Sequence, residues 1–177
     1  LENLSFTGGN IEIFCNDSLL NLKGLKNLSS LNGDLSLGVR VQEDYCGTYD
    51  FGNPSLENLI GLDNIASING DLTVAFNPSF QNFNGLYKLA SVDGNFWIEG
   101  NDTLENLHGL EKLIYVNGDL EIRKNNSLKN YQGLDRLIYV GNDLWVQESE
   151  SLESLSGLEA LTIVGGTIDI GINPVLS

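Results

Sequence analysis

The chain has 177 residues, 41% of them apolar, which is a length and composition typical of a single domain with one buried core. Its 24 acidic and 9 basic residues give a formal net charge of -15. This charge argues against nucleic acid or an anionic membrane surface as a partner, because both require clustered Lys and Arg. No stretch approaches the roughly 18 continuous apolar residues of a membrane-spanning helix, so we predict no membrane insertion.

A 24-residue repeat organises the chain. Apolar residues recur at this interval at positions 56, 80, 104, 128, 152 and 176, and glycines recur at positions 61, 85, 109, 133 and 157. Leu19 and Gly24 lie 37 residues before Leu56 and Gly61, which is one period plus an insertion of 13 residues (37 − 24 = 13). The insertion falls within residues 38–52, and we expect this segment to form a loop that protrudes from the repeat and joins in binding.

Within each repeat the apolar residues first step by three and then by two. A step of two is typical of a strand with one buried face, whereas a sustained step of three, with Gly and Asn in every unit, argues against a long helix. We therefore predict one short strand per unit, at Ile11–Ile13, Leu35–Leu37, Leu72–Val74, Phe96–Ile98, Leu120–Ile122, Leu144–Val146 and Ile168–Ile170. One unit cannot bury its own apolar edge, so the units must stack and the strands must form a parallel sheet. The predicted fold is an all-β solenoid of about seven coils, one domain spanning residues 1–177.

The repeat also carries a family resemblance. The pattern S-L-x-N-L-x-G-L-x-x-L-x-x-V-x-G-D-L-x-I-x-x-N is similar to the leucine-rich repeat, and Ile68-Asn69-Gly70-Asp71-Leu72 resembles more closely the receptor L domain, the family of the ligand-binding lobes of insulin- and EGF-type receptors. This resemblance covers nearly the whole chain. It implies a single-stranded right-handed β-helix at the cell surface, with a ligand site on the sheet face. The coils are more regular than those of the receptors, and kinase-linked signalling is not implied.

The central residue of each predicted strand should point to solvent. Trp97 and Trp145 then lie two coils apart, roughly 10 Å at the usual strand spacing, with Glu121 between them. Aromatic platforms beside polar groups suit a protein hot spot or sugar stacking. The alternative is that both indoles pack against neighbouring side chains or lie under a loop. The predicted ligand-binding residues are Trp97, Trp145, Glu121, Arg123, Glu99, Gln147, Tyr115 and Tyr139.

A column of asparagines follows the strands. Its members are Asn16, Asn53, Asn77, Asn101, Asn125 and Asn173, with Ser149 in the remaining coil. Inward amides at this column can satisfy the backbone of the next coil, so we predict a buried ladder. Sequons that use buried ladder residues would be poor glycosylation acceptors. Asn3 and Asn27 belong to a solvent-facing column, and we predict them as usable glycosylation sites.

The two cysteines, Cys15 and Cys46, lie about one coil apart. Stacked coils bring such positions within reach of a disulfide bond, which would favour an oxidising compartment. The alternative is two buried free thiols.

A column of acidic residues follows the turn glycines at Asp34, Asp71, Asp119 and Asp143. Stacked carboxylates can hold calcium, but Asp beside Gly commonly accepts hydrogen bonds from turn amides. The column also contains Asn10, Asn95 and Thr167, which weaken a continuous ion site. We predict the turn role, and no metal or cofactor.

Catalysis is not expected, because the lone His108 lies in a tolerant surface column and no nucleophile and base recur together. We predict an extracellular or cell-surface recognition or adhesion module whose partner is a protein or a glycan. The alternative is a structural repeat of a surface layer or filament that stacks with neighbouring modules; a polysaccharide-acting β-helix enzyme ranks last. Leu1 falls within a repeat and Asn173 begins another, so we expect residues 1–177 to be part of a longer chain.

Overall fold

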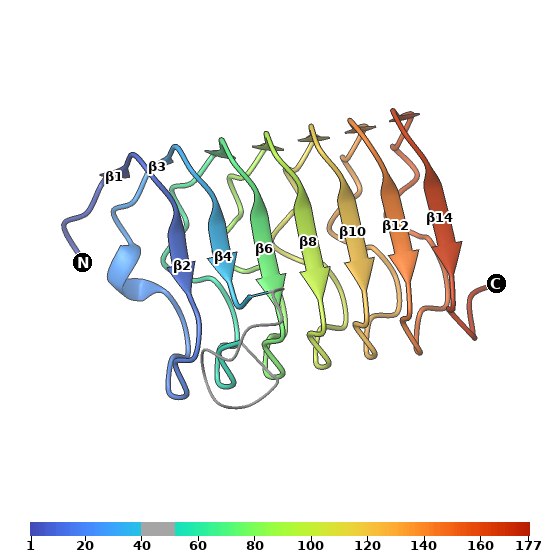
Figure 1. The fold of residues 1–177 in the computed structure, drawn as a ribbon, viewed down its shortest axis with the longest axis horizontal. Helices are drawn as coiled ribbons and strands as arrows, with labels where there is room; N and C mark the ends of the chain where they lie inside the picture. Colours follow the sequence, from blue (N-terminus) through green and yellow to red (C-terminus); the bar gives the residue numbers. More distant parts are fainter. Residues whose placement is uncertain (40–51) are drawn as a thin grey trace.

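The computed structural model describes residues 1–39 and 52–177, so the predicted loop at residues 38–52 lies almost wholly outside the described residues. The predicted fold class is confirmed: the chain is an all-β solenoid of parallel strands with a repeat of about 24 residues. Figure 1 shows the coils stacked side by side, with the two ends of the chain at opposite ends of the stack. Among the described residues, no helix has the length and apolar character needed to cross a membrane.

Two seven-stranded parallel sheets run along the solenoid. Sheet B contains the longer strands: β2 (Ile11–Ile13), β4 (Leu35–Leu37), β6 (Leu72–Ala75), β8 (Phe96–Glu99), β10 (Leu120–Arg123), β12 (Leu144–Gln147) and β14 (Ile168–Gly171). Sheet A contains strands of two residues: β1 (Phe6–Thr7), β3 (Ser30–Leu31), β5 (Ser67–Ile68), β7 (Ser91–Val92), β9 (Tyr115–Val116), β11 (Tyr139–Val140) and β13 (Ile163–Val164). One 3₁₀ turn, η1 (Lys23–Leu25), completes the described secondary structure.

Every predicted strand is present, and five of the seven are one residue longer at the C-terminal end, as in β8. The prediction of one strand per coil was wrong, because each coil also contributes a sheet A strand. A two-residue strand has one inward and one outward side chain, so it produces no alternation that a sequence pattern could show. Its parallel hydrogen bonds form only because the coils already stack in register.

The core is a set of apolar columns that run the length of the solenoid. Cross-strand partners are equivalent residues of successive coils, as where Leu72 pairs with Phe96 and Phe96 with Leu120. These side chains are fully buried, and Phe83 adds edge-to-face ring contacts with Phe80 and Phe96 at centroid distances of 5.0 and 5.8 Å. Each column therefore buries its apolar surface mainly against the same position of the coils above and below.

The repeated glycine is required by close packing between coils. At Gly109 the backbone has φ +107°, a left-handed conformation that favours glycine, and an added Cβ would meet the carbonyl group of Phe83 in the preceding coil. The equivalent glycines have the same conformation and the same close approach. Gly24, in the same column, is the exception, since a Cβ there would have nothing within 4 Å.

The asparagine column forms the predicted ladder. Asn53, Asn77, Asn101 and Asn125 are fully buried. The prediction of burial was wrong for Asn16, which is exposed in the first coil, and Asn173 in the last coil is only partly buried. The Asn77 backbone N–H donates to Asn101 Oδ1 at 3.2 Å, and the Asn101 N–H donates to Asn125 Oδ1 at 3.0 Å. Each Nδ2 also donates to a strand carbonyl, as from Asn101 to Val74 at 2.9 Å. The ladder thus supplies partners for backbone groups where each coil turns away from sheet B.

Candidate functional site

The two tryptophans lie on sheet B in the predicted column. Trp97 of β8 pairs with Glu121 of β10, which pairs with Trp145 of β12. Both indoles are only partly exposed, whereas the sequence pattern predicted exposed side chains. In-register strands about 4.8 Å apart place the side chain of the next coil directly beside each ring, and this shields a large residue more than a small one.

Charged side chains from two neighbouring strands form a connected network beside the indoles. Arg123 Nη2 lies 3.1 Å from Glu99 Oε2, and Arg123 Nε lies 2.8 Å from Glu121 Oε1. Lys124 Nζ lies 3.2 Å from Glu99 Oε1, so the Glu99 carboxylate has two cationic neighbours. The Glu99 side chain is only 5% exposed. Two carboxylates thus face two cations, and pairing offsets the cost of burying Glu99.

The strand register explains this network. Glu99 and Arg123 are direct cross-strand partners, while Glu121 and Arg123 are two residues apart on one strand and therefore share its outer face. Gln147 is the partner of Arg123 on the other side and is half-buried. Lys124 was not predicted as a site residue. It has a left-handed backbone with φ +54°, just beyond β10, and the strand pattern gave no sign of this conformation.

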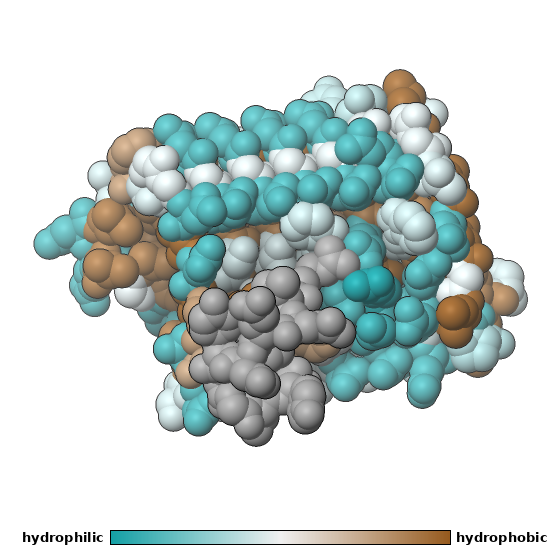
Figure 2. Space-filling model, in the orientation of Figure 1, coloured by the Kyte–Doolittle hydropathy of each residue, from teal (hydrophilic) through white to brown (hydrophobic). Residues whose placement is uncertain are grey.

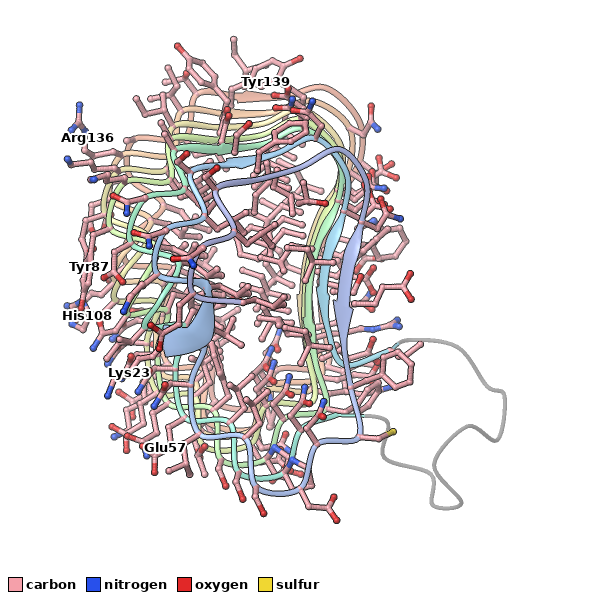
Figure 3. All side chains as sticks on the ribbon, turned by 90° about the vertical axis from the view of Figure 1, so that its left-hand side faces the viewer. Lys23, Glu57, Tyr87, His108, Arg136 and Tyr139 are labelled. Carbon is pink, nitrogen blue, oxygen red and sulfur yellow. The ribbon has the colours of Figure 1, made fainter. Side chains whose placement is uncertain are left out.

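Tyr115 and Tyr139 lie on sheet A, apart from the tryptophans. They are cross-strand partners in β9 and β11, and their ring centroids are 6.4 Å apart with an interplanar angle of 62°. Figure 3, which looks along the solenoid, shows Tyr139 at the top of the section, whereas Tyr87 and His108 lie on the side opposite sheet B. The tyrosine pair therefore forms a second surface of its own.

The acidic turn column serves the backbone. Asp34 Oδ1 accepts a hydrogen bond from the Asp71 N–H at 2.8 Å, and Asp119 Oδ1 accepts one from the Asp143 N–H at 3.0 Å. Asn95 Oδ1 accepts the equivalent hydrogen bond from the Asp119 N–H, which explains why an amide can replace the carboxylate in this column. Within residues 1–39 and 52–177, no three His, Cys, Asp or Glu side chains come together in a way that could hold a metal ion.

The predicted covalent sites are only partly described. Cys15 is not a free thiol, while Cys46 lies outside the described residues, so the Cys15–Cys46 bridge stays a prediction. Asn3 and Asn27 are exposed, as glycosylation requires, and Asn27 Nδ2 donates to the Glu2 carbonyl at 2.6 Å. The ladder sequons are poor acceptors at Asn101 and Asn125, where the amides are fully buried.

His108 lies on the surface far from sheet B. Its Nδ1 is 3.3 Å from Glu111 Oε1, and it lines a shallow polar groove. The groove is lined by Gln81, Asn82, Asn84, Thr103, Glu105, Asn106 and His108. Several of these side chains already serve the fold: Asn106 Oδ1 accepts from the His108 N–H, and the Thr103 hydroxyl donates to backbone carbonyls.

Comparison of the chain with protein-family models, with curated proteins and with solved structures found no match. The candidate site therefore rests on geometry alone: two half-exposed indoles in register with Glu121, beside the charged network of Glu99, Arg123 and Lys124.

Proposed function

We propose that this protein is a non-catalytic recognition or adhesion module of the cell surface, and that it binds a protein or glycan partner with the outer face of sheet B. The observation that carries the proposal is the column Trp97–Glu121–Trp145, two indoles one coil either side of a carboxylate. Partly exposed indoles offer apolar area at low entropic cost, and both protein hot spots and sugar-binding faces use such platforms. The resemblance to receptor L domains supports the same face.

The neighbouring network suits recognition because it is already ordered. Arg123 lies within ion-pair distance of both Glu99 and Glu121, and these two carboxylates restrain its guanidinium group. A preorganised polar group loses less entropy when a partner binds. The indoles then supply contact area, and Arg123 with Gln147 supplies hydrogen-bonding groups that select the partner.

The proposal predicts that replacing Trp97 and Trp145 together with Ala weakens partner binding at least about tenfold, or about 1.4 kcal/mol. A pull-down and a glycan array with the intact chain identify the partner, and titration then gives the two dissociation constants. The matched control is Tyr87→Ala, an exposed aromatic on the opposite side of the solenoid, which should bind as the parent chain does (Figure 3). If the double variant is folded by circular dichroism and its affinity is unchanged, the site lies elsewhere.

The second candidate function is assembly with neighbouring modules. The observation that favours it is the last described coil, where Ile168, Ile170 and Ile172 are exposed. Figure 2 shows hydrophobic side chains gathered at both ends of the stack, whereas rows of hydrophilic residues run along its length. Apolar solenoid ends are usually covered by a cap or by another unit. Sedimentation of the chain over a range of concentrations tests this role, since end-to-end stacking would produce growing oligomers.

A further inference from the structure

Three cations form a row on the side of the solenoid, below the tyrosine pair. Lys88, Lys112 and Arg136 are exposed and occupy equivalent positions in three successive coils. They account for three of the nine basic residues in a chain of net charge -15. We call these three residues the cation row. Such a concentration needs an explanation in so acidic a protein.

The acidic residues that precede the row form no ion pair with it. The Glu111 and Asp135 carboxylates accept hydrogen bonds from the backbone N–H groups of Gly109 and Gly133, at 3.0 and 2.9 Å. They are thereby drawn toward their own turns. Among the described residues Lys112 and Arg136 have no carboxylate within ion-pair distance, and Lys88 donates only to an amide oxygen, that of Asn64, at 2.8 Å. Most other described cations are paired with a carboxylate.

An exposed apolar strip runs beside the cation row. Tyr115, Ile138 and Ile163 are 44%, 37% and 53% exposed, and Tyr139 packs against Tyr115. We call these four residues the tyrosine ridge. The equivalent position is serine at Ser30, Ser67 and Ser91 and apolar again at Phe6 in the first coil. The run of three adjoining apolar residues therefore belongs to the last three described coils and not to every repeat. Contiguous exposed apolar residues of this kind mark interaction surfaces.

The two features lie side by side. Ile138 follows Arg136 by two residues, and Figure 3 shows Arg136 and Tyr139 projecting from adjoining sides of the same upper corner of the section. A ligand lying along the ridge would therefore meet apolar side chains on one edge and cations on the other. Both features follow the solenoid axis, so they suit an extended ligand.

We propose that the tyrosine ridge and the cation row together bind an extended segment of a partner protein that carries carboxylates and apolar side chains. Charge complementarity selects this occupant, because the unpaired cations of the row attract carboxylates while the ridge buries apolar groups. An anionic membrane is a poorer fit. A flat bilayer would approach a wide area of a protein with net charge -15 and be repelled by it, whereas a narrow segment touches the corner alone. This surface is distinct from the tryptophan face of sheet B, so either proposal can fail without the other.

The test uses two fluorescein-labelled decapeptides, one alternating Glu with Leu and one alternating Gln with Leu, titrated against the whole chain by fluorescence anisotropy. We expect the Glu–Leu peptide to bind, the Gln–Leu peptide to bind far more weakly, and the difference to shrink as salt is added. Lys112→Glu with Arg136→Glu should weaken Glu–Leu binding at least about tenfold. Tyr115→Ser with Tyr139→Ser should weaken both peptides. The matched control is Lys23→Glu, an exposed cation outside the row, which should bind as the parent chain does.

Three outcomes overturn the proposal. The first is no binding of the Glu–Leu peptide, or equal binding of both peptides. The second is an equal loss in Lys23→Glu, which would indicate a general charge effect. The third is capture by phosphatidylserine vesicles that disappears in the Lys112→Glu, Arg136→Glu variant while peptide binding does not, which would assign the surface to lipid. Circular dichroism of each variant establishes that the solenoid is intact.

Discussion

At the scale of the residue, Tyr131 is the least expected member of the core. It occupies the column of Leu107 and Phe83 and is fully buried, and its hydroxyl has no hydrogen-bond partner among the described residues. A buried hydroxyl without a partner costs free energy relative to its place in water. Burial also raises the pKa of Tyr131 above its ordinary value of 10.0, because the phenolate would have to form in an apolar environment.

We therefore predict that Tyr131→Phe stabilises the chain, by about 1 kcal/mol near neutral pH. The raised pKa adds a pH dependence. In the unfolded chain Tyr131 loses its proton near pH 10, whereas the folded chain keeps it to higher pH, so this contribution to stability is complete below pH 10 and is lost as the pH rises above it. The parent chain should thus lose stability more steeply above pH 10 than the variant.

Urea unfolding at neutral and alkaline pH measures both effects. Tyr115→Phe is the control, since its ring is exposed and removal of its hydroxyl should leave the free energy of unfolding unchanged. A Tyr131→Phe variant less stable than the parent would show that the hydroxyl has a partner after all.

At the scale of the element, the asparagine ladder holds the turn that follows each sheet B strand. Asn101 accepts from the Asn77 N–H and donates to the Val74 carbonyl, and all of these groups are buried. Removing the amide leaves a buried donor and a buried acceptor without partners, and each costs about 1–3 kcal/mol. Water cannot replace the amide unless the turn opens.

We accordingly expect Asn101→Ala to destabilise the chain by about 2–4 kcal/mol. Asn126→Ala is the matched control, because its amide donates to Asp102 at an exposed position. Thermal and urea unfolding measure the difference in unfolding free energy between each variant and the parent chain. Ser149 shows that a coil tolerates a shorter polar residue in this column. The stability of Asn101→Ser should therefore lie between that of the parent chain and that of Asn101→Ala. Equal stability of the parent and Asn101→Ala would mean that the ladder is dispensable.

At the scale of the whole molecule, the sequence alone was enough to predict the features that follow from residue types recurring at equivalent positions of successive coils. The period of 24 and the buried alternation in segments such as Leu120–Ile122 predicted the solenoid, the sheet B strands and the inward asparagines. Sheet A was missed because its strands contribute a single buried residue each. The pairing of Glu99 with Arg123 and Lys124 was missed for another reason. It depends on side-chain conformations that no repeat encodes, and Lys124 reaches Glu99 from a left-handed turn position.

The candidate site was predicted in position but not in exposure. The alternation along each strand correctly placed Trp97 and Trp145 on the outer face of sheet B, yet both rings are half-buried. Spacing along a chain determines which way a side chain points, whereas its exposure depends on the sizes of the neighbouring side chains. The sequence did not separate Tyr115 and Tyr139 from the tryptophan face, because sheet A, to which they belong, was not predicted.

Nearest-neighbour stacking leads to a prediction for the length of the chain. Deleting residues 77–100 removes one whole coil and joins Phe76 to Asn101, so every core and ladder position again meets its equivalent. This variant should fold, with cooperative unfolding and a strand-type circular dichroism spectrum. Deleting residues 77–99, one fewer, shifts the register and turns apolar side chains outward, and it should not fold. Similar stability of the two deletions would contradict the column account of the core.

Because the coils stack in register, equivalent outward side chains recur at a constant spacing along the solenoid. Any two outward side chains of one column are separated by a whole number of strand spacings, about 4.8 Å each. Gain or loss of a coil between Trp97 and Trp145 would change the distance between the indoles by one strand spacing and leave the packing of the core unaltered. A lineage carrying such a repeat could therefore adjust the span between two contact groups in fixed increments by duplicating or losing a coil, without first solving a new packing problem.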